Sequence, residues 1–195
     1  MEIHESRLGI VGMGAIGRKV AQVAGILGAQ VAYYDIVRAP ENVETELRVT
    51  FKPFDQLLAE SDIVSIHVPL SERTRKMIGK REFELMSPGA VFVNTARGEV
   101  VDQAALAEAL EGGRLAGAAI DALSPEPPPA DNPLLNLSPL ARDRLVVTPH
   151  LGGVTLGFFR RMLRNALENM ARVIAGEPPK NVVNGVLEAR NNRMT

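Results

Sequence analysis

Short runs of mostly apolar residues alternate with longer stretches in which apolar and polar positions mix. The runs lie at residues 8–11, 31–34, 63–66, 90–93, 117–120 and 145–147. Between several of them, apolar residues recur three or four positions apart, which is typical of helices with one apolar side. Apolar strands separated by helices indicate a parallel sheet covered on both faces. We therefore predict an α/β fold with a doubly wound parallel sheet.

Local signals mark where the helices begin and end. A helix is expected over about 16–27, and a short one around Leu57 and Leu58. Asp102 is a predicted N-cap, and its helix should end at the glycine pair 112–113. A long helix should begin near Thr155 and end at 176–178.

Two stretches give no regular pattern. Residues 36–50 are polar and predict an irregular segment, with a short strand at 48–50. Residues 121–140 hold six of the 13 prolines, which predicts an extended, stiff loop.

The turn after the first strand carries the pattern Gly-x-Gly-x-x-Gly. Gly12 permits a tight turn, Gly14 lets the backbone approach a pyrophosphate, and Gly17 lets helix and strand pack closely. The next helix begins here, with Ala15 and Ile16, and its free N–H groups favour phosphate. An ordinary tight turn is the alternative, but the strand before it and the helix after it favour a dinucleotide site.

Asp35 ends the second strand, 18 residues beyond Gly17. A carboxylate at this position can accept hydrogen bonds from the adenosine ribose and would repel a 2′-phosphate. The sequence therefore predicts NAD(H) rather than NADP(H). Arg38 lies close by, so some tolerance of NADP stays open.

Other polar residues directly follow predicted strands. They are His67, Thr95, Arg97, Asp121 and His150. The carboxyl ends of parallel strands share one edge of the sheet, and ligands bind there. We therefore expect these side chains to converge on one crevice.

Composition and charge exclude several other classes of protein. The 195 residues are 46% hydrophobic, enough for a large core, and the net charge of −1 gives no basis for binding nucleic acid. The chain has no Cys, so disulfides are excluded, and its His, Asp and Glu residues show no metal-ligand spacing. The longest apolar stretch, 20–34, is interrupted and too short to cross a membrane. A cytoplasmic protein is expected.

Five segments together resemble the cofactor domain of the D-isomer-specific 2-hydroxyacid dehydrogenases, across about residues 6–184. They are Gly9-Ile10-Val11-Gly12-Met13-Gly14-Ala15-Ile16-Gly17, Ile66-His67-Val68-Pro69-Leu70, Val93-Asn94-Thr95-Ala96-Arg97-Gly98, Asp121-Ala122-Leu123-Ser124-Pro125-Glu126-Pro127 and Thr148-Pro149-His150-Leu151-Gly152-Gly153. The resemblance implies a Rossmann fold and an NAD-dependent oxidoreductase that transfers a hydride between nicotinamide and a small 2-keto or D-2-hydroxy acid.

The resemblance also implies a catalytic set. Arg97 matches the family's substrate-orienting arginine, whose planar guanidinium binds a carboxylate and polarises the keto oxygen. His150 matches the general acid and base, and Glu126 matches the carboxylate that stabilises its imidazolium. His67 is the competitor for the acid-base role, although its position favours cofactor contact.

Further residues match the family's cofactor contacts. Asp121 matches the residue that hydrogen-bonds the nicotinamide carboxamide. The remaining matches would lie along the dinucleotide: His67, Val68, Pro69, Thr95, Ala96, Arg97, His150 and Gly152.

The sequence departs from the family in its length. We expect one domain over residues 1–195, with a core at about 6–184 and a tail at 185–195, and with the family's substrate domain missing. NAD(H) binding should survive, but half of the substrate pocket would be absent. The alternative to an enzyme is therefore an NAD(H)-binding module or sensor without its own turnover. We also expect a homodimer, or a partner chain that supplies the missing domain.

Overall fold

The chain divides into two compact units, Met1–Gly152 and Gly153–Thr195. The computed structural model describes residues 2–182. Each unit is considered by itself.

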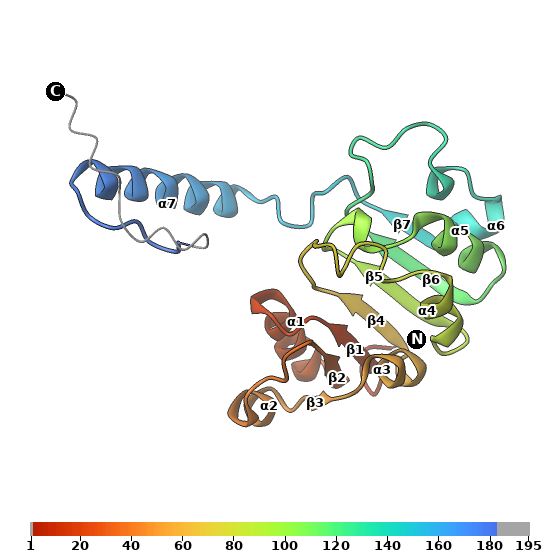
Figure 1. The fold of residues 1–195 in the computed structure, drawn as a ribbon. Coiled ribbons are helices and arrows are strands. Elements are labelled where there is room, and N and C mark those ends of the chain that lie inside the picture. Colours follow the sequence, from red (N-terminus) through yellow and green to blue (C-terminus); the bar gives the residue numbers. More distant parts are fainter. Residues whose placement is uncertain (1, 183–195) are drawn as a thin grey trace. The chain divides into compact units, whose positions relative to one another are not determined.

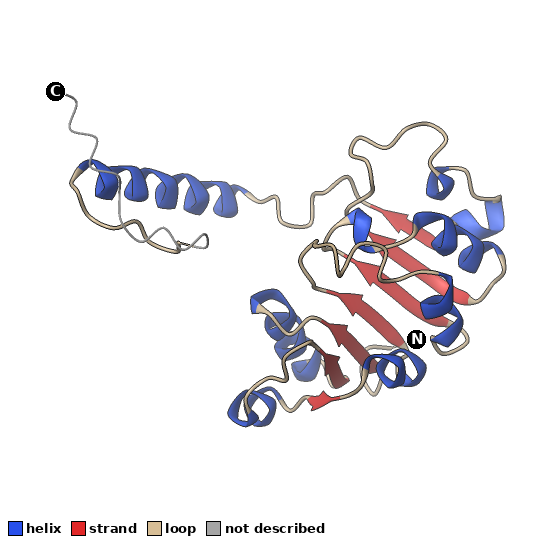
Figure 2. Cartoon of the chain, in the orientation of Figure 1, coloured by secondary structure: helices blue, strands red, loops and turns tan. Residues whose placement is uncertain are grey.

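The first unit is built on a seven-stranded sheet in which every pairing is parallel (Figures 1 and 2). Its strands are β1 (Arg7–Val11), β2 (Gln30–Tyr34), β3 (Thr50–Phe51), β4 (Ile63–Ile66), β5 (Ala90–Asn94), β6 (Leu115–Ile120) and β7 (Leu145–Val147). Their order in the sheet is β3-β2-β1-β4-β5-β6-β7. The chain thus builds outward from β1 in one direction and from β4 in the other. The predicted doubly wound α/β fold is confirmed.

Helices connect the strands. In chain order they are α1 (Ala15–Ile26), α2 (Glu41–Leu47), α3 (Phe54–Glu60), α4 (Lys80–Leu85), α5 (Gln103–Glu111) and α6 (Pro139–Arg142), with short 3₁₀ helices at Gly98–Val100 and Pro133–Leu135. The predicted caps are confirmed: the Asp102 carboxylate accepts hydrogen bonds from the Ala104 and Ala105 amides. Gly112 is the C-cap of the same helix, and Gly113 has a positive φ.

Two apolar clusters lie on opposite faces of the sheet. One contains Leu8, Ile10, Ala21 and Ala24, so it packs between β1 and α1. The other is larger and contains side chains of β4, β5, α3, α4 and α5, such as Phe83 and Phe92. Strand residues alternate between the two faces, as a pleated strand requires.

Helices of the first unit itself cover only one face of part of the sheet. On the α1 side, Val93 pairs with Ala119, which pairs with Val146, and the Val146 side chain is 62% exposed. The helices after β4 in this unit pack with the larger cluster on the other face. Within the first unit, the α1 side of β5, β6 and β7 is therefore uncovered.

Two expectations about loops need correction. Residues 36–50 are not irregular throughout, because α2 occupies 41–47 and the short strand lies at Thr50–Phe51. No residue of this helix is fully buried, and only Val43 and Leu47 pack against the smaller apolar cluster, so its apolar repeat is short. The proline-rich stretch 121–140 is not extended throughout, because it holds the 3₁₀ helix Pro133–Leu135 and the start of α6.

The second unit consists mainly of helix α7 (Leu156–Ile174). Thr155 is its N-cap, as predicted, and the Thr155 hydroxyl accepts a hydrogen bond from the Phe158 amide. The expected tail, 185–195, lies outside the described residues. Among the helices described, none is long and apolar enough to span a membrane.

Candidate functional site

The glycine turn after β1 is closed by backbone packing at two of its three glycines. Gly12 has a φ of +102°, and a Cβ there would lie 2.7 Å from the His67 carbonyl oxygen. At Gly17 a Cβ would lie 2.1 Å from the Gly12 carbonyl oxygen. At Gly14, by contrast, a Cβ would meet nothing within 4 Å. The first and third glycines therefore serve the fold, whereas the second leaves open space beside the start of α1.

Asp35 is positioned by the same turn. One carboxylate oxygen accepts a hydrogen bond from the Met13 amide at 2.7 Å, and the other accepts one from the Ile36 amide at 2.7 Å. These contacts fix the acid at the carboxyl end of β2, beside the glycine turn. A fixed acceptor at this position suits ribose hydroxyls.

A pocket of about 510 Å³ opens next to the turn. Its lining comes from the start of α1 and from the loops after β4 and β5: Gly14, Ala15, Ile16, His67, Val68, Pro69, Leu70, Thr95, Ala96 and Arg97. Nine of these ten residues are candidates from the sequence; Leu70 is the addition. Because β1 and β4 are neighbours at which the chain reverses its direction of growth, this is the crevice where ligands of such sheets bind.

The loop that carries Arg97 is shaped by a buried amide. The Asn94 side chain is fully buried, accepts a hydrogen bond from the Ala96 amide at 3.0 Å and donates one to the Arg97 carbonyl at 2.9 Å. The Arg97 side chain is exposed and donates to the Ala96 carbonyl at 2.7 Å. Asn94 therefore holds the backbone while the guanidinium stays at the surface of the pocket.

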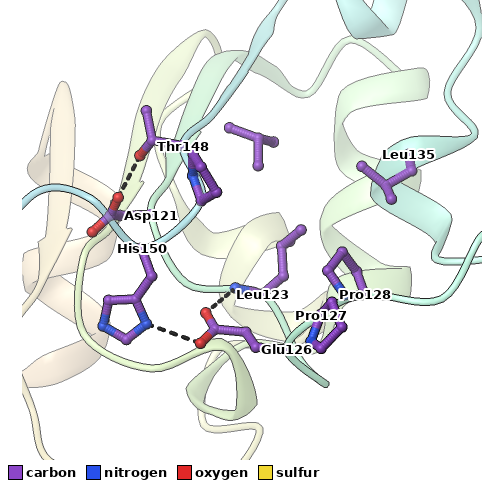
Figure 3. Close-up of a pocket in the computed structure, with 10 residues that line it drawn as sticks. Asp121, Leu123, Glu126, Pro127, Pro128, Leu135, Thr148 and His150 are labelled. Atoms are coloured by element: carbon purple, nitrogen blue, oxygen red, sulfur yellow. Dashed lines mark hydrogen bonds and ion pairs between the residues drawn. The ribbon is translucent and has the colours of Figure 1, made fainter.

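Glu126 and His150 lie in contact across two loops (Figure 3). Glu126 Oε2 lies 2.9 Å from His150 Nδ1, and Glu126 Oε1 accepts a hydrogen bond from the Leu123 amide at 3.2 Å. The carboxylate is thus fixed by the backbone at one oxygen and orients the imidazole with the other. His150 has a φ of +56°, and its amide donates to the Asp121 carbonyl at 2.8 Å. Over residues 2–182, no hydrogen bond engages Nε2, the other ring nitrogen, so it can serve a ligand.

Asp121 organises the loop after β7. Its carboxylate accepts hydrogen bonds from the Thr148 hydroxyl and from the amides of Leu151 and Gly152. Burial would raise the pKa of Asp121, but these three donors hold that pKa below its ordinary value. A Cβ at Gly152 would lie 2.9 Å from an Asp121 carboxylate oxygen. Asp121 and Gly152 therefore fit a role in shaping the loop around His150.

His67 lies in a different setting from His150. Burial lowers the pKa of His67, and its Nε2 lies 2.9 Å from the Ser65 hydroxyl. A neutral imidazole tied to a neighbouring hydroxyl lines the pocket but is a poor proton donor. This arrangement favours His150 over His67 for proton transfer.

The candidate residues gather around two pockets of the first unit. Glu126, Asp121 and His150 line one of about 460 Å³, whereas Arg97 lines the pocket beside the glycine turn. In the described part of the chain, no hydrogen bond or ion pair links Arg97 to His150 or Glu126. Sequence reasoning missed the supporting roles of Ser65, Asn94 and Thr148. The first two belong to strands and gave no signal of their own.

The site was compared with known proteins. The family described as D-isomer specific 2-hydroxyacid dehydrogenase, NAD binding domain, matches residues 1–152. The chain belongs to this family. The family's NAD-binding domain is the part that it contains, as the resemblance implied.

Relatives and solved structures agree with this result. The chain is 44% identical to a glyoxylate reductase of Korarchaeum cryptofilum over 94% of its length and 53% of the relative's. It is 38% identical to a D-3-phosphoglycerate dehydrogenase of Archaeoglobus fulgidus, over 94% of its length and 34% of the relative's. A D-lactate dehydrogenase of Lactobacillus jensenii, solved with NAD⁺, superposes with a TM-score of 0.81 at 36% identity, over 94% of this chain and 57% of that one. The chain thus spans about half the length of the glyoxylate and D-lactate enzymes.

The residues present fit NAD. The open space at Gly14, the fixed Asp35 carboxylate and the pocket that joins the loops after β4 and β5 match the phosphate, ribose and nicotinamide ends of the cofactor. Among the described residues, no group of three or more His, Asp or Glu side chains is placed to hold a metal ion.

Proposed function

We propose that this chain is the cofactor half of a 2-hydroxyacid dehydrogenase, in which Arg97, Glu126 and His150 handle the substrate. The observation that carries the proposal is the contact of 2.9 Å between His150 Nδ1 and Glu126 Oε2. A domain that only bound dinucleotide would not require an oriented imidazole next to a carboxylate fixed by the backbone.

Each member of the set has a distinct task. When bound, the nicotinamide would exchange a hydride with the substrate carbon. The Arg97 guanidinium would hold the carboxylate of a 2-keto acid and polarise its keto oxygen. Protonated His150 would donate the proton from Nε2 to that oxygen, and Glu126, in contact with Nδ1, would stabilise the imidazolium that makes this donation. In the direction of oxidation, neutral His150 would accept the hydroxyl proton.

We also propose that the residues expected from the sequence to contact the cofactor do so. The phosphates would lie at Gly12, Gly14, Ala15, Ile16 and Gly17, and the ribose at Asp35. The nicotinamide end would lie along the second set: His67, Val68, Pro69, Thr95, Ala96, Arg97, Asp121, His150 and Gly152. The lining of the pocket beside the turn supports this path for most of these residues.

A titration followed by a turnover assay tests the proposal. The purified chain is titrated with NADH and NADPH, and glyoxylate, hydroxypyruvate or pyruvate is then added while NADH oxidation is recorded. His150→Ala should leave NADH affinity within about twofold and lower turnover by about 10²–10⁴-fold. His4→Ala is the matched control, because His4 is an exposed residue at the N-terminal end. A large loss of NADH affinity in His150→Ala would instead mean that His150 mainly holds the cofactor and would contradict its role in proton transfer.

A binding module without turnover is the second candidate. In such a module only the glycine turn, Asp35 and the pocket beside the turn would carry the function. NADH binding with no oxidation by any of the three keto acids would support it. Restoration of turnover by a second polypeptide would support the enzyme.

The assembly and the location of the chain are proposals as well. The apolar side chains of the first unit that line the groove between α1 and the sheet support a homodimer, or a partner chain, because large apolar surfaces favour association. Residence in the cytoplasm is tested by fractionation of cells that express the chain.

A further inference from the structure

The segment between β2 and α2 contains a cation beside the proposed ribose site. Arg38 lies three residues after Asp35 and is the one charged residue of the stretch 36–40. In related dinucleotide sites, an arginine near the ribose can accommodate the 2′-phosphate of NADP. Whether this chain distinguishes the two cofactors thus depends on what Arg38 is bound to.

The guanidinium of Arg38 is already engaged on two sides. Its Nε donates to Glu44 Oε1 at 2.9 Å and its Nη2 donates to Glu44 Oε2 at 2.8 Å. The guanidinium carbon also lies 5.7 Å from the centre of the Phe51 ring. A bidentate contact of this kind is among the stronger side-chain pairs in proteins.

Glu44 is anchored in turn by a buried tyrosine. The Tyr33 hydroxyl donates to Glu44 Oε1 at 2.6 Å and accepts a hydrogen bond from the Ala39 amide at 2.8 Å. Tyr33 is fully buried, and the Glu44 side chain is only 11% exposed. The Arg38 and Tyr33 donors lower the pKa of Glu44 to about 2, so Glu44 is charged at neutral pH.

A 2′-phosphate would have to compete with this arrangement. To reach it, Arg38 would give up both contacts and leave a largely buried carboxylate without its cation, which is costly. Asp35 would meanwhile repel the phosphate. A ribose hydroxyl requires neither change.

We propose that Glu44 is a specificity-determining residue: by binding Arg38, it keeps the cation of the segment between β2 and α2 from serving a 2′-phosphate and so favours NAD(H) over NADP(H). The inference rests on the proposed NAD(H) site and adds the residue that controls its preference. Glu44 contacts no part of the proposed catalytic set, and it acts through Arg38.

Calorimetric titrations of the full chain with NADPH and NADH test this inference. They are made in the Asp35→Ser background, which removes the repulsion and brings NADPH binding into the measurable range. Glu44→Gln keeps an acceptor for Tyr33 but removes the charge that holds Arg38. It should improve NADPH affinity about three- to tenfold and change NADH affinity less than about twofold. Adding Arg38→Ala to Glu44→Gln should remove the gain.

Two controls make the result specific. Glu41→Gln removes one negative charge from an exposed position of the same helix and should leave NADPH affinity within about twofold. Arg38→Ala with Glu44 intact should also change NADPH affinity little, because Arg38 is bound to Glu44 before the substitution and does not serve the phosphate. This second control needs no change at Glu44 and stays informative if Glu44→Gln does not fold.

Different failures identify different errors. If NADH binds but Glu44→Gln gives no gain for NADPH, or if Arg38→Ala alone weakens NADPH binding more than about threefold, the inference is wrong and the cofactor site stands. If the folded wild-type chain binds no NADH, the proposed function fails, and this inference fails with it.

Discussion

At the scale of single residues, the glycine turn separates positions that the fold needs from a position that a ligand needs. A side chain at Gly17 would collide with the backbone of Gly12, whereas one at Gly14 would project into open space. Glycine is thus required at Gly17 by backbone packing and at Gly14 by the space that a ligand needs. Substitution of Gly17 should lower stability, whereas substitution of Gly14 should lower cofactor affinity.

We expect Gly14→Val to fold normally and to lose NADH affinity by about tenfold or more, because the new side chain would fill the space assigned to the pyrophosphate. Gly17→Ala should lower the free energy of unfolding by about 1–3 kcal/mol through overpacking. Urea unfolding and NADH titration of both variants check this pair. Unchanged NADH affinity in a folded Gly14→Val chain would contradict the assignment of the turn.

His67 makes a residue-scale prediction about pH. Burial lowers the pKa of His67 in the folded chain, whereas a histidine in the unfolded chain has a pKa of about 6.5. Between these two values the unfolded state binds more protons, so stability falls as the pH drops below about 6.5. His67→Gln lacks this contribution and should lose less stability between about pH 7.5 and pH 5.5.

Urea unfolding at the two pH values measures this difference. His4→Gln is the control, because His4 is exposed and should leave the pH dependence of the wild-type chain unchanged. Parallel curves for wild type and His67→Gln would show that the imidazole is not protected from protonation by the fold.

At the scale of elements, the predictions succeeded where the signal was local. Asp102 and Thr155 cap their helices because the side chain and the amides that it binds are within three residues of one another. Helix α2 was missed because it fully buries no residue and follows Pro40, which offers no side-chain cap. Helix α4 has six residues and buries only Phe83, too little to give a periodic pattern.

The site shows the same division. Residues that follow strands, such as Arg97 and His150, were predictable because the direction of a parallel strand fixes the edge at which it ends. The contacts between separate elements could not be predicted. The hydrogen bonds from Tyr33 to Glu44 and from Thr148 to Asp121 join residues whose spacing in the sequence gives no sign of the contact.

The N-cap of α5 gives a prediction at this scale. Asp102→Ala should lower the free energy of unfolding by about 1 kcal/mol, because the Ala104 and Ala105 amides lose their acceptor. Asp102→Asn should retain most of the cap. Asp102 also lies 3.2 Å from Lys76 Nζ, so Lys76→Ala is measured to separate the ion pair from the cap. A loss in Lys76→Ala equal to that in Asp102→Ala would assign the effect to the ion pair.

At the scale of the whole molecule, the order of the strands decides where chemistry can occur. Because β1 and β4 are adjacent while the chain leaves them in opposite directions, the loops after these strands diverge and leave a crevice between them. The glycine turn, the His67 segment and the Arg97 loop meet there although they are far apart in the sequence. The reversal of strand order between β1 and β4 therefore determines where the candidate site lies.

The same topology leaves an apolar surface that should govern association. A groove between α1 and the sheet is lined mostly by apolar side chains, among them Val23 at 56% and Leu27 at 50% exposure. Contiguous apolar surface of this kind favours self-association. We expect the chain to sediment as more than one copy at high micromolar concentration, and Val23→Glu with Leu27→Glu to shift it toward a single copy without loss of stability, since both side chains are already half exposed.

Two comparisons decide whether this groove is responsible. Leu140→Glu places the same charge on an exposed position of α6 and should leave the association unchanged. Met162→Glu with Leu163→Glu tests the exposed apolar residues of α7. If only the α7 variant reduced the sedimenting mass, the association surface would be α7 rather than the groove. A wild-type chain that sediments as one copy throughout would show that exposed valine and leucine on this face are too few to hold two chains together.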